Sequence, residues 1–275
     1  MLKFVRTTPV VVAIALLVGS AVAQVSFSPP QSLADKGVIT YCATIDNPPR
    51  AFFDEAGAPQ GFEIDLGVEI ADRLGLEVQW EQMAFDGIIP SLLAARCDAI
   101  VQELFIRESR LETIDMIPFA FSAQSLVVQA GSDLAISGPE DLSGLKVAVP
   151  NGTTIFNILT ETNEALAADG KDPIDLVILE TTTDTFQQLG AGQVDAVGTT
   201  NTAAAYYVGL SGDTFAFAGD TFGKILDGIG FAKESSVLQV AMGAALSSMM
   251  LDGTYDELLA KWNLQGAGLL GGSGN

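Results

Sequence analysis

Hydrophobic residues recur with two alternating periods from residue 38 onward. Leu66, Ile70 and Leu74 stand at helical spacing and Gly75 follows as a stop signal, whereas residues 38–43 form a short apolar run typical of a buried strand. The pattern predicts strands at 38–43, 76–80, 98–101, 146–149, 176–179 and 194–197, and helices at 65–74, 88–95, 154–167, 183–189, 235–250 and 255–262.

The regular alternation of strands and helices predicts an α/β fold in which most strands are parallel. Two segments of the chain are alike: residues 92–100 and residues 188–197 each end a helix, turn, and enter a strand through an Asp-Ala pair. This weak internal repeat suggests two lobes that are built on one plan.

The first residues have the pattern of an export signal. Lys3 and Arg6 precede an apolar run at 10–18, and Ala21 and Ala23 form a small-x-small cleavage site. The alternative is a membrane anchor, but a spanning helix needs about 20 apolar residues. We therefore expect a signal peptide at residues 1–23 that is cleaved on export.

Composition narrows the chemistry. The net charge is −21, with 34 acidic and 13 basic residues, so the surface is expected to repel nucleic acid and anionic lipid. The chain has no histidine, which excludes a Ser-His-Asp triad and a Cys-His pair and argues against zinc. We expect neither a metal nor a cofactor. Whether Cys42 and Cys97 form a disulfide stays open, because the sequence does not give the distance between them.

Several short motifs occur in a fixed order between about residues 36 and 263. They are Asn47-Pro48-Pro49, Phe52-Phe53-Asp54-Glu55-Ala56-Gly57, Gly61-Phe62-Glu63-Ile64-Asp65-Leu66, Phe85-Asp86-Gly87-Ile88-Ile89-Pro90, Cys97-Asp98-Ala99-Ile100, Arg110 with Asp115, Val147-Ala148-Val149-Pro150-Asn151-Gly152-Thr153-Thr154, Val194-Asp195-Ala196, and Asp252-Gly253-Thr254-Tyr255 with Lys261-Trp262. In this order the motifs resemble those of the polar amino-acid-binding proteins of ABC importers, family 3 of the extracellular solute-binding proteins.

The resemblance implies a type II periplasmic-binding-protein clamshell of two α/β lobes joined by two hinge strands. Lobe 1 would comprise residues 24–122 and 229–275, and lobe 2 residues 123–228. A periplasmic monomer would capture an amino acid, or a compact carboxylate-bearing zwitterion or amine, in the cleft between the lobes. It would then deliver this ligand to an ABC permease in the inner membrane.

Arg110 is the first candidate binding residue, since in similar proteins the arginine at this place holds the ligand carboxylate. A guanidinium offers two parallel charge-assisted hydrogen bonds, which lysine cannot match. The alternative is a surface ion pair with Glu108 or Glu112.

Gly152, Thr153 and Thr154 lie between a predicted strand and a predicted helix start. The free N–H groups and the dipole of such a start favour an anion, and the threonine hydroxyls add donors. The alternative is an ordinary helix cap, and both roles can hold together.

Two further candidates concern the walls of the pocket. Phe85 stands where similar proteins place a large apolar side chain against the ligand; the alternative is packing in the core. Asn47 stands where many relatives have an aromatic ring, which leaves the specificity for the ligand side chain open.

The ammonium end departs most from the family pattern. Relatives have an aspartate at the position of Thr200, and it holds the ligand ammonium. Glu103 could supply the missing carboxylate and Phe105 a cation–π face. The alternative is that Glu103 pairs with Arg107 or Arg50 and never meets the ligand.

Glu63 and Asp65 are expected to stabilise a helix start through capping and the helix dipole. A few dehydratases resemble this family, so a cleft enzyme in which Glu103 acts as an acid is the second hypothesis. A sensor ectodomain that feeds a partner receptor is the third.

Overall fold

The computed structural model describes residues 28–269, so the predicted signal peptide lies outside the described residues. The first half of the chain forms the elements α1 (Gln31–Lys36), β1 (Val38–Ala43), β2 (Phe52–Phe53), β3 (Pro59–Gln60), α2 (Phe62–Leu74), β4 (Glu77–Gln82), the 3₁₀ turn η1 (Phe85–Gly87), α3 (Ile88–Leu93), β5 (Ala99–Ile100) and α4 (Glu108–Leu111).

The long strand β6 (Ile114–Gln129) leads into the second half. That half contains η2 (Pro139–Leu142), β7 (Lys146–Pro150), α5 (Thr154–Ala168), β8 (Asp175–Leu179), α6 (Thr182–Gly190), β9 (Ala196–Thr200) and α7 (Asn201–Leu210). A second long strand returns to the first half and is followed by its last helices: β10 (Phe215–Ala232), α8 (Ser236–Asp252), α9 (Thr254–Lys261) and η3 (Gln265–Ala267).

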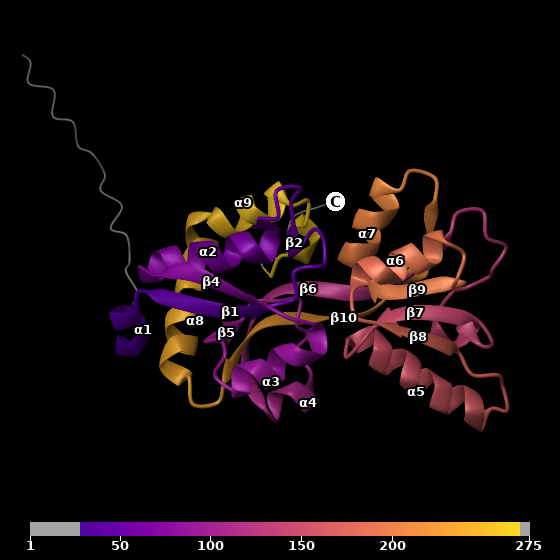
Figure 1. The fold of residues 1–275 in the computed structure, drawn as a ribbon, viewed down its shortest axis with the longest axis horizontal. Coiled ribbons are helices and arrows are strands. Elements are labelled where there is room, and N and C mark those ends of the chain that lie inside the picture. Colours follow the sequence, from indigo (N-terminus) through magenta and orange to yellow (C-terminus); the bar gives the residue numbers. More distant parts are fainter. Residues whose placement is uncertain (1–27, 270–275) are drawn as a thin grey trace, which may run out of the picture.

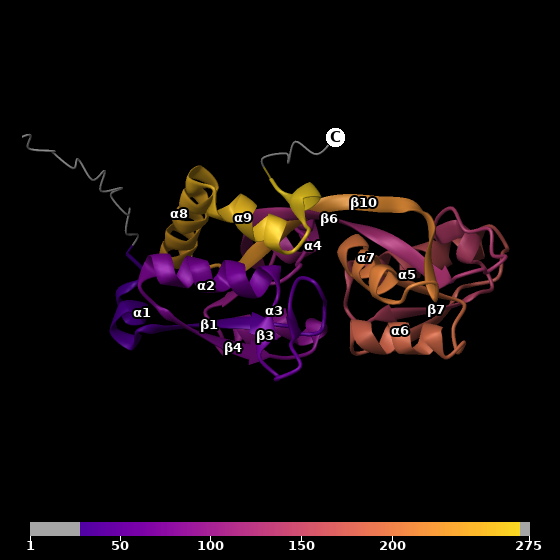
Figure 2. The ribbon, with the colours of Figure 1, turned by 90° about the horizontal axis from the view of Figure 1, so that it is seen from above.

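The strands β6 and β10 join two lobes (Figure 1). They pair in antiparallel fashion from Ile114 opposite Ala232 to Gln129 opposite Phe215. The strand order β4-β1-β5-β10-β6-β9-β7-β8 places three strands of each lobe on either side of this pair. Figure 2 shows the same two lobes from above, with β6 and β10 crossing between them. This is the clamshell that the sequence predicts.

Each lobe has its own core. In lobe 1, helices α2, α8 and α9 pack against the sheet through a large apolar cluster that includes Phe62, Leu66, Ile70, Phe119, Met242 and Tyr255, and α3 covers the other face. In lobe 2, one cluster lies under α5 and a second under α6 and α7. Sheets covered by helices on both faces are typical of α/β folds.

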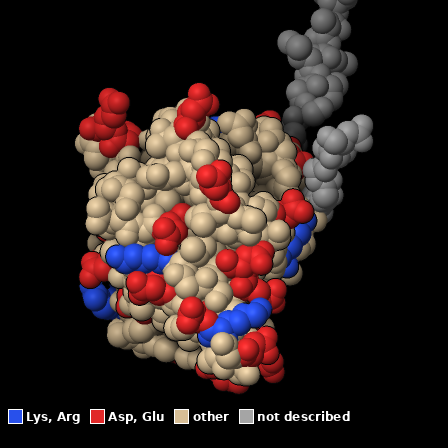
Figure 3. All heavy atoms as spheres, turned by 90° about the vertical axis from the view of Figure 1, so that its right-hand side faces the viewer, with Lys and Arg blue, Asp and Glu red and all other residues tan. Residues whose placement is uncertain are grey.

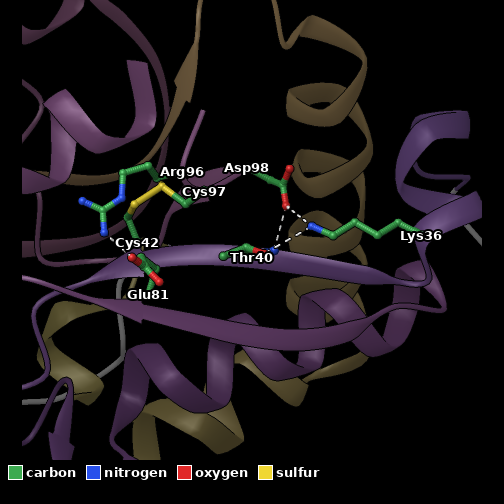
Figure 4. The surroundings of a disulfide bond; sticks show 7 residues. All are labelled: Lys36, Thr40, Cys42, Glu81, Arg96, Cys97 and Asp98. Carbon is green, nitrogen blue, oxygen red and sulfur yellow. Dashed lines mark hydrogen bonds and ion pairs between the residues drawn. A yellow bond between two sulfur atoms is a disulfide. The ribbon is translucent and has the colours of Figure 1, made fainter. Parts of the chain in front are cut away.

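A disulfide joins Cys42 and Cys97, which resolves the alternative that the sequence left open. The Cα atoms are 5.5 Å apart, because Cys42 on β1 lies beside the segment that enters β5. Figure 4 shows Asp98 next to the bridge, where its carboxylate accepts a hydrogen bond from the backbone N–H of Thr40 at 2.7 Å. The disulfide and this bond fasten the two strands together.

Acidic side chains outnumber basic ones at the lobe 2 end of the molecule (Figure 3). Figure 3 views the molecule from the lobe 2 end, where acidic side chains are scattered over the face and basic ones are few. Within residues 28–269, none of the helices has the length and apolar character that crossing a membrane requires.

The expected strands and helices all occur, with ends that differ by a few residues. The sequence pattern did not predict α1, α4, α7 or the two-residue strands β2 and β3, and the long strands β6 and β10 were expected only from the family resemblance, without bounds. Helix α7 was missed because Asn201–Leu210 has no clear apolar periodicity: three alanines and two tyrosines fill half of it.

We predict that removing the disulfide destabilises lobe 1. The bridge closes a loop of 55 residues, and loss of a native disulfide typically lowers the free energy of unfolding by about 2 to 5 kcal/mol. Urea unfolding of a Cys42→Ser, Cys97→Ser double variant should show this loss. Reduced wild-type protein is the control, and unchanged stability in both samples would contradict the prediction.

Candidate ligand-binding site

A pocket of about 530 Å³, a volume that includes space open to solvent, lies between the two lobes. Its lining combines aromatic and aliphatic side chains with hydroxyl, amide and carboxylate groups, namely Phe85, Phe105, Pro150, Ile155, Thr44, Thr153, Thr154, Thr182, Thr199, Thr200, Asn47, Gln102, Gln124, Asp46, Glu103 and Glu180. Seven of the nine predicted site residues are among them. Within the described chain, Arg110 and Gly152 are not part of this lining.

Arg110 lies directly behind the two aromatic walls. Its guanidinium carbon is 5.5 Å from the centroid of the Phe85 ring, and its Nη1 donates to the carbonyl oxygen of Phe105 at 2.9 Å. Among the described residues it makes neither of the alternative ion pairs, with Glu108 or with Glu112. Burial, and to a lesser degree the charge of Arg107, lowers the pKa of Arg110 to about 10.

The start of α5 forms another wall. Thr153 caps this helix: its Oγ1 accepts from the N–H of Phe156 at 3.3 Å and donates to the carbonyl of Pro150 at 2.8 Å. The capping role therefore holds, and Thr153 and Thr154 also face the pocket. Their role in ligand binding stays a prediction.

Gly152 lies at a close contact between the two lobes. Its φ is +69°, and a Cβ atom there would stand 2.9 Å from the Cβ of Asp86 in the other lobe. Beside it, Nδ2 of Asn151 donates to the Asp86 carboxylate at 2.8 Å. Gly152 thus permits contact between the lobes, although it does not line the pocket.

Glu103 is held by donors from both lobes. Its Oε2 accepts from Asn47 Nδ2 at 2.6 Å and from Thr200 Oγ1 at 3.0 Å. Its Oε1 accepts from Thr202 Oγ1 at 2.9 Å and lies 3.1 Å from Nε of Arg50. The ion pair with Arg50 is one of the two alternatives weighed from the sequence, yet Glu103 also lines the pocket.

Arg50 stands at the centre of a buried charge cluster, defined as Arg50, Glu63, Glu103 and Asp227. Its Nη1 lies 3.3 Å from Glu63 and 3.0 Å from Asp227. Glu63 lies in the first turn of α2, where an acid was expected, but the helix start has no side-chain capping bond and Glu63 is fully buried against Arg50. Gly61, at φ +129°, lets the start of α2 lie close to Arg50, because a Cβ atom at position 61 would overlap the carbonyl oxygen of Arg50.

Burial shifts the protonation of this charge cluster. It raises the pKa of Glu63 to about 8 and that of Asp227 to about 7, although Arg50 opposes both shifts. Burial alone would lower the pKa of Arg50, but Glu103, Asp227 and Glu63 together raise it above its ordinary value.

Several pocket residues were not predicted from the sequence. Oδ2 of Asp46 accepts from the N–H of Thr182 at 3.1 Å across the cleft, and burial raises the pKa of Asp46 to about 6. Both amide atoms of Gln124 are buried and have no hydrogen-bond partner among the described residues. A buried unpaired amide is costly, so Gln124 is suited to meet a polar ligand group. Only its place on the crossing strand β6 could have revealed it.

The profile of the bacterial extracellular solute-binding proteins, family 3, matches residues 39–265, and the chain belongs to this family. It is 30% identical over 260 residues to the lysine/arginine/ornithine-binding periplasmic protein of Escherichia coli, covering 92% of this chain and 95% of that one. It is 27% identical over 262 residues to the L-cystine-binding protein TcyJ of Escherichia coli, covering 92% of both.

Solved structures agree with this membership. An ancestral arginine-binding protein bound to arginine has a TM-score of 0.76 at 35% identity, covering 82% of this chain and 98% of that one. The P235GK mutant of the arginine-binding protein from T. maritima has a TM-score of 0.77 at 33% identity, covering 84% and 97%. The family and fold expected from the motifs are confirmed.

We predict that Gly152→Ala holds the lobes apart. The added methyl group would press on Asp86, so small-angle scattering should give a larger radius of gyration than for the wild type. Gly170→Ala is the matched control, because Gly170 has φ +70° in the same lobe and no atom within 4 Å of the added Cβ. Equal scattering from the two variants would contradict the prediction.

We also predict that the ligand-free protein loses stability as pH rises. The raised pKa values of Glu63 and Asp227 mean that the folded state binds more protons than the unfolded chain, in which both groups titrate near pH 4. The free energy of unfolding should therefore fall from about pH 5 to about pH 8. Urea unfolding should show a shallower fall in Glu63→Gln, and a rise over this range would count against the assignment.

Proposed function

We propose that this chain is the periplasmic substrate-binding component of an ABC importer. It captures an amino acid, or a compact carboxylate-bearing zwitterion or amine, in the pocket between the lobes and delivers it to the membrane permease. The observation that carries the proposal is a polar and aromatic pocket at the lobe interface of a family 3 fold. A solved structure of similar fold, at 27% identity, is the substrate binding protein of an amino acid ABC transporter.

The proposed lobes are residues 24–122 with 229–275, and residues 123–228. Closure about β6 and β10 would enclose the ligand. The contacts of Asp46 with Thr182 and of Glu103 with Thr200 already join the lobes across the pocket. The protein is proposed to work as a periplasmic monomer after cleavage of its signal peptide.

The proposed carboxylate end is formed by Arg110, Thr153 and Thr154. The two threonines face the pocket at the start of α5, where an anion is favoured. Arg110 supplies the positive charge from behind Phe85. Relatives of this chain are named as binding proteins for lysine, arginine, ornithine, histidine or cystine, which supports an amino-acid ligand.

The proposed cationic end is formed by Glu103, with Phe105 beside it. Glu103 takes the place of the aspartate that the family motif has at Thr200. The hydrogen bond from Thr200 to Glu103 brings the two positions together, which supports this substitution. Asp46 and Glu180 add negative charge to the same pocket.

We propose that the protein is a binding protein and not an enzyme. The named curated relatives are binding proteins. A solved ancestral amino-acid-binding protein, described as a precursor of cyclohexadienyl dehydratase, has a TM-score of 0.76 at 29% identity, so an enzyme is a neighbouring possibility in this fold. Incubation with every solute that binds, followed by mass spectrometry, should find no product.

A thermal-shift screen with L-arginine, L-lysine, L-histidine, L-cystine and glycine betaine tests the function directly. A ligand present at 100 times its Kd stabilises the folded state by about 2.7 kcal/mol, which gives a clear shift in Tm. Absence of any shift with these solutes and with the remaining amino acids would contradict an amino-acid-binding role.

We predict that Glu103→Gln weakens binding of a cationic ligand far more than Thr200→Ala does. Loss of a charged partner should reduce the affinity by about 10- to 100-fold, whereas loss of one neutral hydroxyl should cost about tenfold or less. Calorimetry on both variants measures the difference, with circular dichroism as a check of folding. Small and equal losses of affinity in the two variants would contradict a ligand-binding role for Glu103.

A further inference from the structure

The buried charge cluster contains more acid than base. One guanidinium faces three carboxyl groups, and all four side chains are at most 4% exposed. Three ionised carboxylates would leave two uncompensated negative charges away from water, which is strongly unfavourable. Among residues 28–269, no group of three or more such side chains is arranged to hold a metal ion. The excess charge must therefore be reduced by protons.

The hydrogen bonds of Ser122 indicate where one of these protons lies. Its Oγ lies 2.6 Å from Oε1 of Glu103 and 2.7 Å from Oδ2 of Asp227, and it accepts from Nη2 of Arg50 at 2.6 Å. A serine hydroxyl has one proton and can donate it to only one of the two carboxyl groups. A guanidinium can only donate. The second carboxyl group must then donate to Ser122, so it carries a proton itself.

The surrounding donors indicate which carboxyl group is protonated. Glu103 accepts from Asn47, Thr200 and Thr202 and faces Nε of Arg50, an arrangement that suits the ionised form. Oδ1 of Asp227, in contrast, has no partner among the described residues. The pKa of Asp227, raised by burial to about 7, agrees with a proton at this position.

Asp227 experiences charge from several elements besides its own strand β10. Arg50 and Glu103 act on it directly. It also interacts with Glu63 of α2, Arg110 of α4 and Tyr255 of α9. Of the three carboxyl groups in the cluster, only Glu103 is among the described residues that line the pocket. Ser122 lies within hydrogen-bond distance of both Glu103 and Asp227, so a ligand charge at Glu103 changes the electrostatic environment of Asp227.

We propose that the pocket exchanges a proton for the cationic group of its ligand: an ammonium or guanidinium that docks at Glu103 drives the buried proton off Asp227. This inference rests on the proposed function, because it concerns the same pocket. The incoming cation replaces the donors at Oε2 of Glu103 and neutralises the charge of Glu103, which adds to burial in raising the pKa of Asp227. The proton leaves to solvent, and the cluster keeps its charge balance.

The consequence is an affinity that depends on pH. Because binding releases a proton, a cationic solute binds more tightly as pH rises. For one group that titrates near pH 7, full exchange raises the affinity by about tenfold between pH 6 and pH 8. Ser122 lies on β6 and Asp227 on β10, so the exchange takes place where the two hinge strands meet.

The test is calorimetry with L-arginine, or with the tightest-binding solute of the thermal-shift screen if that is another one. Titrations at pH 7 in phosphate and in Tris give the number of protons released from the difference in heat. We expect about half a proton per bound ligand at this pH. Affinities at pH 6 and pH 8 give the tenfold change independently.

Variants identify the source of the proton. Asp227→Asn should abolish both the release and the pH dependence. Should this variant fail to fold, Ser122→Ala serves instead, because it leaves every charge in place and should reduce the release. Asp115→Asn is the matched control, since Asp115 also lies on a hinge strand but pairs with Lys233 outside the cluster; its release should equal that of the wild type.

Two contrary outcomes are distinguishable. Tight binding with no proton release and equal affinity at pH 6 and pH 8 overturns the proton exchange and leaves the binding function intact. Absence of binding by every solute at every pH overturns the proposed function, and the exchange with it.

Discussion

The buried contacts of Arg50 with three carboxyl groups and with Ser122 are the constraint on which lobe 1 depends. One buried guanidinium joins α2 through Glu63, the pocket through Glu103 and the hinge strand β10 through Asp227. It also donates to Ser122 on the other hinge strand, β6. Removing one partner of such a buried pair is strongly destabilising, because the remaining charge is left without compensation. A single side chain therefore links α2 of lobe 1, both hinge strands and the pocket.

This arrangement also determines the electrostatic character of the pocket. Glu103 is the member of the buried charge cluster that lines the pocket, and this cluster has more carboxyl groups than guanidinium groups. Asp46 and Glu180 add further carboxyl groups to the lining. Positive charge comes from Arg110, behind the Phe85 ring on the lobe 1 side. A solute with separated cationic and anionic groups complements this distribution, whereas a dianion would meet mainly like charge.

Much of the fold was predictable from periodicity, and family membership from the order of short motifs. Local pattern did not reveal α7, whose alanines and tyrosines have no amphipathic period, or the role of Glu63, which looks like a helix-start acid in sequence. Pairings such as Arg50 with Asp227 join residues far apart in the chain. They depend on the path of β10 back into lobe 1, which sequence spacing does not encode. The pocket amide of Gln124 was missed because the bounds and path of the crossing strand β6 were not predicted from the pattern.

The most direct test of a pocket built for a carboxylate and a cation is to identify what the protein captures from a mixture. Purified protein is incubated with a bacterial cell extract, repurified and denatured, and the released small molecules are identified by mass spectrometry. The account predicts one enriched molecule that carries both a carboxylate and a cationic nitrogen. Enrichment of a neutral sugar, or of a dicarboxylate without a cationic group, would contradict it.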